Sequence, residues 1–176
     1  MDNAKVIGNS LVGGLIGVAT STIISEVGVD AVVDGVNIVG GMVGQASGVN
    51  ISDSYVSGAV NLDGDASFVG GLVGLYSGSD SHITNSYGTA IVKGGDGYDW
   101  YAYKTGTTTI TNSYYWNGAV DKTRHSDGLR TMAELKTNGA TTSTSTTATF
   151  SNWSTSTWTF PTEPVSYTHL TLPTKA

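Results

Sequence analysis

The sequence contains one glycine-rich hexamer in three slightly different copies: VGGLIG at 12–17, VGGMVG at 39–44 and VGGLVG at 69–74. Their first glycines, Gly13, Gly40 and Gly70, are 27 and 30 residues apart. Periods of this length are typical of stacked architectures, in which one unit cannot bury its apolar face without its neighbours. We therefore interpret the hexamer as a building block rather than as a site.

A second phrase follows each hexamer in the same order. It reads ISDSYVSGAV at 51–60, ITNSYGTAIV at 83–92, ITNSYYWNGAV at 110–120 and, in a degraded form, ISEVGVDAVV at 24–33. Short β-branched runs broken by Gly, Asn, Asp and Ser indicate strands joined by tight turns. We predict an all-β fold, a parallel β-solenoid of about four coils, in which successive coils stack about 4.8 Å apart.

Stacking makes each repeated position a column of side chains. We expect an aliphatic ladder of Ile24, Ile51, Ile83 and Ile110, and a second ladder of Leu15, Met42 and Leu72. An aromatic stack would contain Tyr55, Tyr87 and Tyr114, and a left-handed turn column would contain Asp53, Asn85 and Asn112. Strand alternation places Leu72 opposite Val69 and Val73, so we expect the glycines to bend the chain there.

Composition agrees with an all-β class and excludes several functions. The chain has 24 glycines, is 39% hydrophobic and 12% charged, and contains no cysteine, which excludes disulfides and thiolate metal sites. Residues 1–100 hold ten acidic residues against Lys5 and Lys93, a local charge of −8. Such a surface repels a phosphate backbone, so we expect no nucleic-acid partner.

The apolar stretch at 11–24, LVGGLIGVATSTII, resembles a leader or a membrane segment at first sight. It is shorter than the ~20 residues that cross a bilayer, and no convincing cleavage site follows it. Its first half also recurs in mid-chain. We therefore interpret it as the first repeat and expect no membrane span.

The two phrases resemble the GLUG motif, a repeat named for its Gly-Leu-x-Gly pattern. That pattern is present as GLIG at 14–17, GMVG at 41–44 and GLVG at 71–74, and the NSY phrase at 85–87 and 112–114 belongs to the same repeat. The resemblance covers about residues 11–120 and implies a bacterial secreted or cell-surface protein. It implies a non-catalytic module, adhesin-like or a stalk, whose partners are glycan or protein surfaces.

The rest of the chain divides differently. We expect solenoid repeats over 1–120, a cap and linker over 121–164, and a non-native tail over 165–176. Thr131 and Glu134 match a capping box that begins a short helix, and Gly139 closes it. FSNWSTSTWTF at 150–160 alternates like a final strand pair. The tail VSYTHLTLPTKA resembles a translated sequencing adapter, so the natural protein is expected to be interrupted near Pro164.

One short motif suggests calcium. GGDGYD at 94–99 fits the GGxGxD turn of calcium-binding nonapeptide repeats, with Asp96 and Asp99 as ligands. Calcium needs six or more oxygen ligands, which such repeats supply by stacking consecutive copies, and this chain has one copy. A plain Gly/Asp turn between coils is the favoured interpretation.

Seven of the sixteen aromatic residues lie within 98–116. Exposed rings with polar tips suit amphipathic ligands such as sugars, so a carbohydrate-binding surface is one hypothesis. Its candidate residues are Trp100, Tyr101, Tyr103, Tyr115 and Trp116. The favoured alternative is that these rings cover the end of the solenoid core.

No catalytic signature is present. His82 and His125 stand in no paired arrangement, and His169 lies in the non-native tail. Acidic residues on an outer groove, namely Asp53, Asp63 and Asp65, are the remaining catalytic candidates, and four coils give only a short groove. We expect a module that is not an enzyme. A further alternative is the non-catalytic stalk of a larger secreted enzyme, such as a peptidase.

Overall fold

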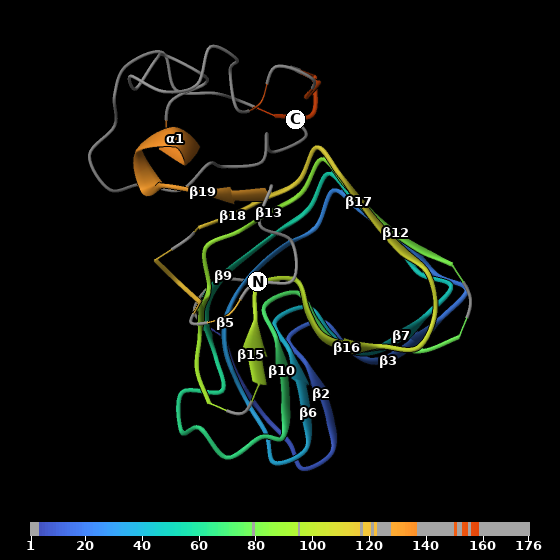
Figure 1. Cartoon of the computed structure of the whole chain (residues 1–176), viewed down its shortest axis with the longest axis vertical. Coiled ribbons are helices and arrows are strands. Elements are labelled where there is room, and N and C mark those ends of the chain that lie inside the picture. The colour runs from blue at the N-terminus through green and yellow to red at the C-terminus, as the bar shows by residue number, and fades with distance from the viewer. Residues whose placement is uncertain are drawn as a thin grey trace.

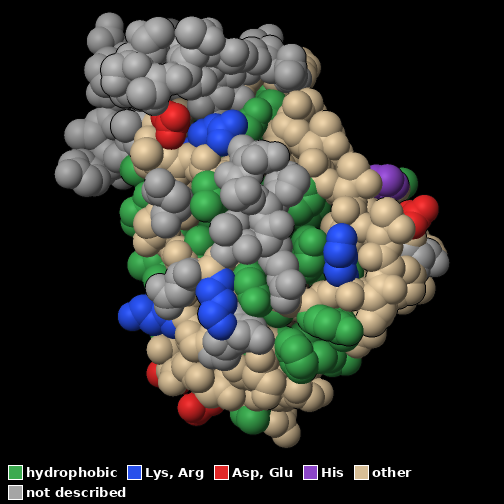
Figure 2. Space-filling view, in the orientation of Figure 1, with side chains coloured by type: hydrophobic (Ala, Val, Ile, Leu, Met, Phe, Trp, Pro, Cys, Tyr) green, Lys and Arg blue, Asp and Glu red, His purple; other side chains and the backbone are tan. Residues whose placement is uncertain are grey.

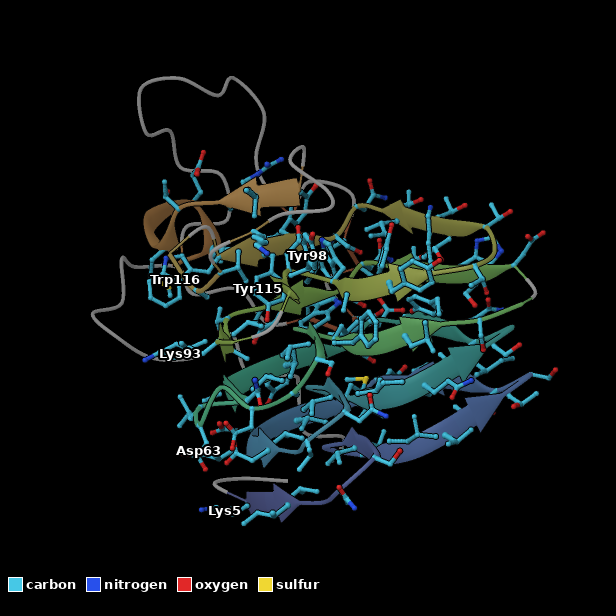
Figure 3. All side chains as sticks on the ribbon, turned by 60° about the horizontal axis from the view of Figure 1, so that its bottom comes forward. Lys5, Asp63, Lys93, Tyr98, Tyr115 and Trp116 are labelled. Atoms are coloured by element: carbon cyan, nitrogen blue, oxygen red, sulfur yellow. The ribbon has the colours of Figure 1, made fainter. Side chains whose placement is uncertain are left out.

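The chain winds into a parallel β-solenoid (Figure 1). The computed structural model describes residues 4–78, 80–94, 96–116, 118–120, 122, 128–136, 150, 153–154 and 156–158. Figure 3 shows the coils stacked in chain order, with the first at one end and the C-terminal strand and helix at the other. The predicted fold class is confirmed.

Four parallel sheets, here called A to D, run the length of the stack. Sheet A contains β1 (Ala4–Ile7), β5 (Gly28–Asp34), β9 (Tyr55–Val60), β13 (Tyr87–Gly88), β14 (Ile91–Val92), β18 (Tyr114–Trp116) and β19 (Leu129–Arg130). Sheet B contains β2 (Leu11–Gly13), β6 (Ile38–Gly40), β10 (Phe68–Gly70) and β15 (Asp96–Tyr98). Sheet C contains β3 (Ile16–Thr20), β7 (Val43–Ser47), β11 (Val73–Tyr76) and β16 (Tyr101–Lys104). Sheet D contains β4 (Ile23–Ser25), β8 (Asn50–Ser52), β12 (Ser81–Thr84) and β17 (Thr108–Thr111).

Each coil contributes to all four sheets, so coil 1 begins with β2, coil 2 with β6, coil 3 with β10 and coil 4 with β15. The coils are not equally long. In sheet A, Gly28 pairs with Tyr55 across 27 residues, Tyr55 with Tyr87 across 32, and Tyr87 with Tyr114 across 27. The longer step lies between coils 2 and 3, and its extra residues fall at two corners, before β10 and before β12.

The predicted aliphatic ladder is confirmed. Ile24 pairs with Ile51, Ile51 with Ile83, and Ile83 with Ile110, in adjacent strands of sheet D. The first three are buried, and Ile110, in the last coil, is half-buried. Met42 and Leu72 are fully buried as well, whereas Leu15 is 38% exposed because coil 1 is the first coil, and among the described residues β2 and β3 are the end strands of their sheets.

The corner between sheets D and A is the predicted turn column. Asp53, Asn85 and Asn112 have φ values of 48°, 47° and 47°, and Glu26 occupies the same corner of coil 1 with φ 56°. Short polar side chains tolerate this left-handed conformation better than most others. The degraded first repeat therefore keeps the backbone of the corner although its residue has changed.

The hexamer forms the bend between sheets B and C, which points into the solenoid (Figure 1). Val69, Leu72 and Val73 are all fully buried, so the bend expected at the glycines is confirmed. The first glycine of one hexamer lies against the last glycine of the hexamer in the next coil. A Cβ on Gly40 would overlap the carbonyl oxygen of Val43 and the amide nitrogen of Gly74. Only glycine fits where backbones of successive coils approach so closely.

Coil 4 makes the hexamer bend with an unrelated sequence, which the repeat pattern does not indicate. In the register of sheets B and C, Gly97 pairs with Val69, Tyr98 with Gly70, and Tyr101 with Val73. Residues 97–102, GYDWYA, therefore occupy the hexamer position of coil 4. Aromatic residues stand at three of its six positions, so coil 4 follows the same backbone path with a different sequence.

The C-terminal part begins as predicted and then departs from the prediction. Helix α1 (Met132–Lys136) starts at the expected capping box: the Glu134 amide donates to Thr131 Oγ1 (3.2 Å), and the Thr131 amide donates to Glu134 Oε2 (2.8 Å). Strand β19 extends sheet A beyond β18. Gly139, the linker at 141–149 and the tail at 165–176 lie outside the described residues.

The strand pair expected at 150–160 is not found in the described residues of that segment. Phe150, Trp153 and Trp158 instead lie in turns, with Trp153 N–H bonded to the Phe150 carbonyl (3.0 Å) and Trp158 N–H to the Ser154 carbonyl (3.0 Å). The alternation of aromatic residues favours a strand, but the rings of Phe150, Trp153 and Trp158 gather in one cluster on the flank of the solenoid.

Candidate functional site

The five aromatic residues predicted to bind carbohydrate do not lie on one surface. Trp100, Tyr101 and Tyr115 are buried, Trp116 is half-buried, and Tyr103 is 48% exposed. Figure 3 shows Tyr115 within the stack and Trp116 at its side. Three of the rings therefore belong to the core of coil 4.

Trp100 and Tyr115 fill the interior of coil 4. Trp100 takes the column of Met42 and Leu72, and its ring meets Tyr115 edge-on, with centroids 5.5 Å apart. The Tyr115 hydroxyl donates to the Ala90 carbonyl (3.1 Å), and its ring occupies the space above Gly88. Burial, and secondarily the nearby Asp99 carboxylate, raises the pKa of Tyr115.

Tyr103 has an exposed aromatic neighbour that the sequence did not indicate. Phe68, on β10, is 38% exposed, and its ring centroid lies 6.1 Å from that of Tyr103, with the planes tilted by 47°. Leu75, half-buried, is the sheet C partner of Tyr103 in coil 3. Figure 2 shows hydrophobic side chains gathered over β10 and β16 on this face. We call Phe68 and Tyr103 the exposed aromatic pair.

The two predicted calcium ligands lie in and beside the bend of coil 4. Asp99 is fully buried at the position that Gly71 holds in coil 3, and Asp96 opens β15. Among the described residues, no group of three or more His, Asp or Glu side chains is placed to hold a metal ion. The calcium site stays a prediction.

The remaining acidic candidates lie at different corners. Asp53 is in the turn column between sheets D and A, where its Oδ1 accepts from Asn85 Nδ2 (3.3 Å). Asp63 and Asp65 are exposed in the loop that joins β9 to β10, on the other side of sheet A, and Figure 3 places Asp63 at the edge of the stack. His82 is exposed on β12, and His125 lies outside the described residues.

The NSY phrase builds a hydrogen-bonded serine ladder that sequence reasoning missed. Each serine hydroxyl donates to the carbonyl two residues earlier: Ser54 to Ser52 (2.6 Å), Ser86 to Thr84 (2.8 Å) and Ser113 to Thr111 (2.8 Å). Each also accepts a backbone N–H from the preceding coil: from Val27 (3.2 Å), Ser54 (3.3 Å) and Ser86 (3.1 Å). The ladder satisfies buried backbone groups at a corner where the strands are interrupted.

The tyrosine of the same phrase points outward. Tyr55 and Tyr87 stack with centroids 5.1 Å apart and planes 7° apart, and Tyr114 is the sheet partner of Tyr87 in the next coil. We call Tyr55, Tyr87 and Tyr114 the tyrosine column. Coil 1 has Gly28 at this position, and the Tyr55 ring lies over it.

The chain matches no family model, no curated protein and no solved structure. In the described part of the chain, no helix has the length and apolar character needed to cross a bilayer. The described chain is a parallel β-solenoid with an exposed aromatic pair on one face and a covered tyrosine column on another.

Proposed function

We propose that the chain is a non-catalytic repeat module of a bacterial secreted or cell-surface protein, serving as an adhesin-like segment or a stalk. The observation that supports this proposal is the unbroken register of the interior columns across four coils. A stack of this kind spans distance by adding coils, and each coil needs only its neighbours for burial. The resemblance to GLUG repeats supplies the secreted, surface-attached setting.

Duplicating one coil tests the stalk function. A second copy of residues 38–67, inserted after Ser67, keeps the next residue, Phe68, in register because Phe68 pairs with Ile38. We expect the folded chain to lengthen by about 4.8 Å along the stack, measured by small-angle X-ray scattering. As a matched control, the same residues in scrambled order have the same length and composition. An insert that leaves the long dimension unchanged would refute additive stacking.

The exposed aromatic pair favours a second candidate, a carbohydrate-binding surface. Phe68 and Tyr103 come from successive coils and offer two adjacent apolar rings, one with a hydroxyl tip. We expect Tyr103→Ala and Phe68→Ala to abolish retention on a glycan array. Ile91→Ala, which removes a comparably exposed apolar side chain from sheet A, is the control. Retention unchanged in both aromatic variants would eliminate this candidate.

A further inference from the structure

The tyrosine column is covered by a segment that lies far along the chain. Phe150, Trp153 and Trp158, together with Leu135 of α1, form an apolar cluster around it that is separate from the solenoid core. We call the described residues 150, 153–154 and 156–158 the tryptophan segment. The segment belongs to the cap and linker predicted over 121–164, and its described rings pack against the flank of the solenoid.

The segment descends the stack from coil 4 towards coil 2. Phe150 meets Tyr114 edge-on at 5.5 Å, and Trp153 lies 6.1 Å from Tyr114 and 6.3 Å from Tyr87. Trp158, further along, lies 5.7 Å from Tyr87. These contacts join residues of successive coils to one short piece of chain.

Two hydrogen bonds add specificity for tryptophan. Trp153 Nε1–H donates to the Asn112 carbonyl (2.7 Å), and Trp158 Nε1–H donates to Asp53 Oδ1 (3.4 Å). Both acceptors belong to the turn column, which runs beside the tyrosine column. An indole combines a large apolar ring with one N–H donor, so each tryptophan is held both by ring contacts and by a hydrogen bond.

The contacts that join the described part of the segment to the two columns run through side chains. The rings of Phe150, Trp153 and Trp158 lie on the tyrosine column, and two indole N–H groups reach the turn column. Within the segment, the Trp153 amide donates to the Phe150 carbonyl and the Trp158 amide to the Ser154 carbonyl. Ring contacts and indole N–H groups of this kind are equally available to a separate peptide.

We propose that the tyrosine column, with the adjoining turn column, is a peptide-docking site selective for two tryptophans five residues apart, and that the tryptophan segment is its tethered occupant. The residues that make the site are the repeated Asn/Asp and Tyr of the NSY phrase, so each such coil adds to it. A free peptide with the sequence of residues 150–158 therefore fits the same site once the tethered copy is removed.

The full-length chain carrying Trp153→Ala and Trp158→Ala tests the proposal. A fluorescently labelled peptide FSNWSTSTW is titrated against this variant and against the wild type, with fluorescence anisotropy as the readout. We expect saturable binding to the variant and affinity for the wild type lower by a factor of about ten or more, because a tethered ligand competes at about millimolar effective concentration. Adding Tyr87→Ala should abolish the binding, whereas adding Tyr103→Ala, on another face, should leave it unchanged.

Two results overturn the proposal: a variant with the wild-type far-UV circular dichroism that does not bind the peptide, or a wild type that binds it as tightly as the variant does. Should the double variant not fold, hydrogen exchange on the wild-type chain decides. Amides of residues 150–158 that open well before those of β9 and β13 support a separable ligand, and amides that exchange only with these strands refute it.

Discussion

Replacing Gly40 by alanine should destabilise the solenoid through the hexamer bend. The new Cβ would overlap backbone atoms of Val43 and Gly74, which belong to two successive coils. Neither strand can move away freely, because the amides of Met42 and Val43 both bond the Leu72 carbonyl at this point, at 2.9 and 3.0 Å. The substitution therefore forces a choice between steric overlap and broken interstrand hydrogen bonds.

The expected cost follows from these two terms. Overpacking costs about 1–3 kcal/mol, and each lost backbone hydrogen bond costs about 1 kcal/mol. Alanine restricts the unfolded chain, which returns about 0.4–1 kcal/mol. The net loss is about 3 kcal/mol, which for a chain of this size lowers the melting temperature by about 10 °C.

Gly97→Ala is the matched control. Gly97 holds the hexamer position of Val69, and a Cβ there would lie 3.0 Å from the Gly94 carbonyl oxygen and 3.3 Å from the Val92 side chain, so only small adjustments are needed. Both substitutions restrict the unfolded chain equally, so their difference isolates the overlap at the bend. Urea denaturation followed by circular dichroism measures it, and free energies of unfolding within about 1 kcal/mol of each other would refute the reasoning.

Three further outcomes are expected. Ser86→Ala should lower the free energy of unfolding, measured by urea denaturation, by about 2 kcal/mol, because it removes the acceptor of the buried Ser54 amide and the donor to the Thr84 carbonyl. Ser67→Ala, at an exposed loop position, is the control and should be neutral. Equal effects of the two substitutions would show that the serine ladder does not stabilise the fold. Burial raises the pKa of Tyr76, Tyr87 and Tyr115 above the ordinary 10.0. The free energy of unfolding should therefore be independent of these groups below about pH 10 and should fall as the pH rises further, because their phenols ionise first in the unfolded chain. Tyrosinate absorbance that developed fully near pH 10 in the folded chain would contradict this. Chelation by EDTA should leave the melting temperature unchanged, because the chain has one copy of the GGxGxD turn and calcium sites of this kind draw six or more oxygen ligands from stacked copies; a lowered melting temperature would point to a cation at Asp96 and Asp99.

The periodic part of the fold was predictable because stacking converts sequence repeats directly into contacts. The ladder from Ile24 to Ile110 and the left-handed corner at Asp53, Asn85 and Asn112 needed only correct alignment of the repeats. The bend of coil 4 was missed because Tyr98, Asp99 and Ala102 stand where the other copies have glycine, so that only the register of the strands reveals it.

The candidate surfaces were less predictable, since exposure of an aromatic residue depends on its neighbours in three dimensions. Trp100 and Tyr103 are three residues apart, yet one is completely buried and the other lies half in solvent. Phe68 gave no signal, because its partner Tyr103 lies in the next coil. The docking of Trp158 near Asp53 joins residues 105 positions apart, a distance over which no local pattern operates.

The unequal coils have a consequence for how such a chain can vary. Between coils 2 and 3 the additional residues lie at the corners before β10 and β12, while the columns on either side stay in register. Length changes are thus absorbed at corners and do not propagate along the stack. Those corners are places where loops of different size and chemistry can be exchanged, on one coil at a time, without redesigning the scaffold that presents them.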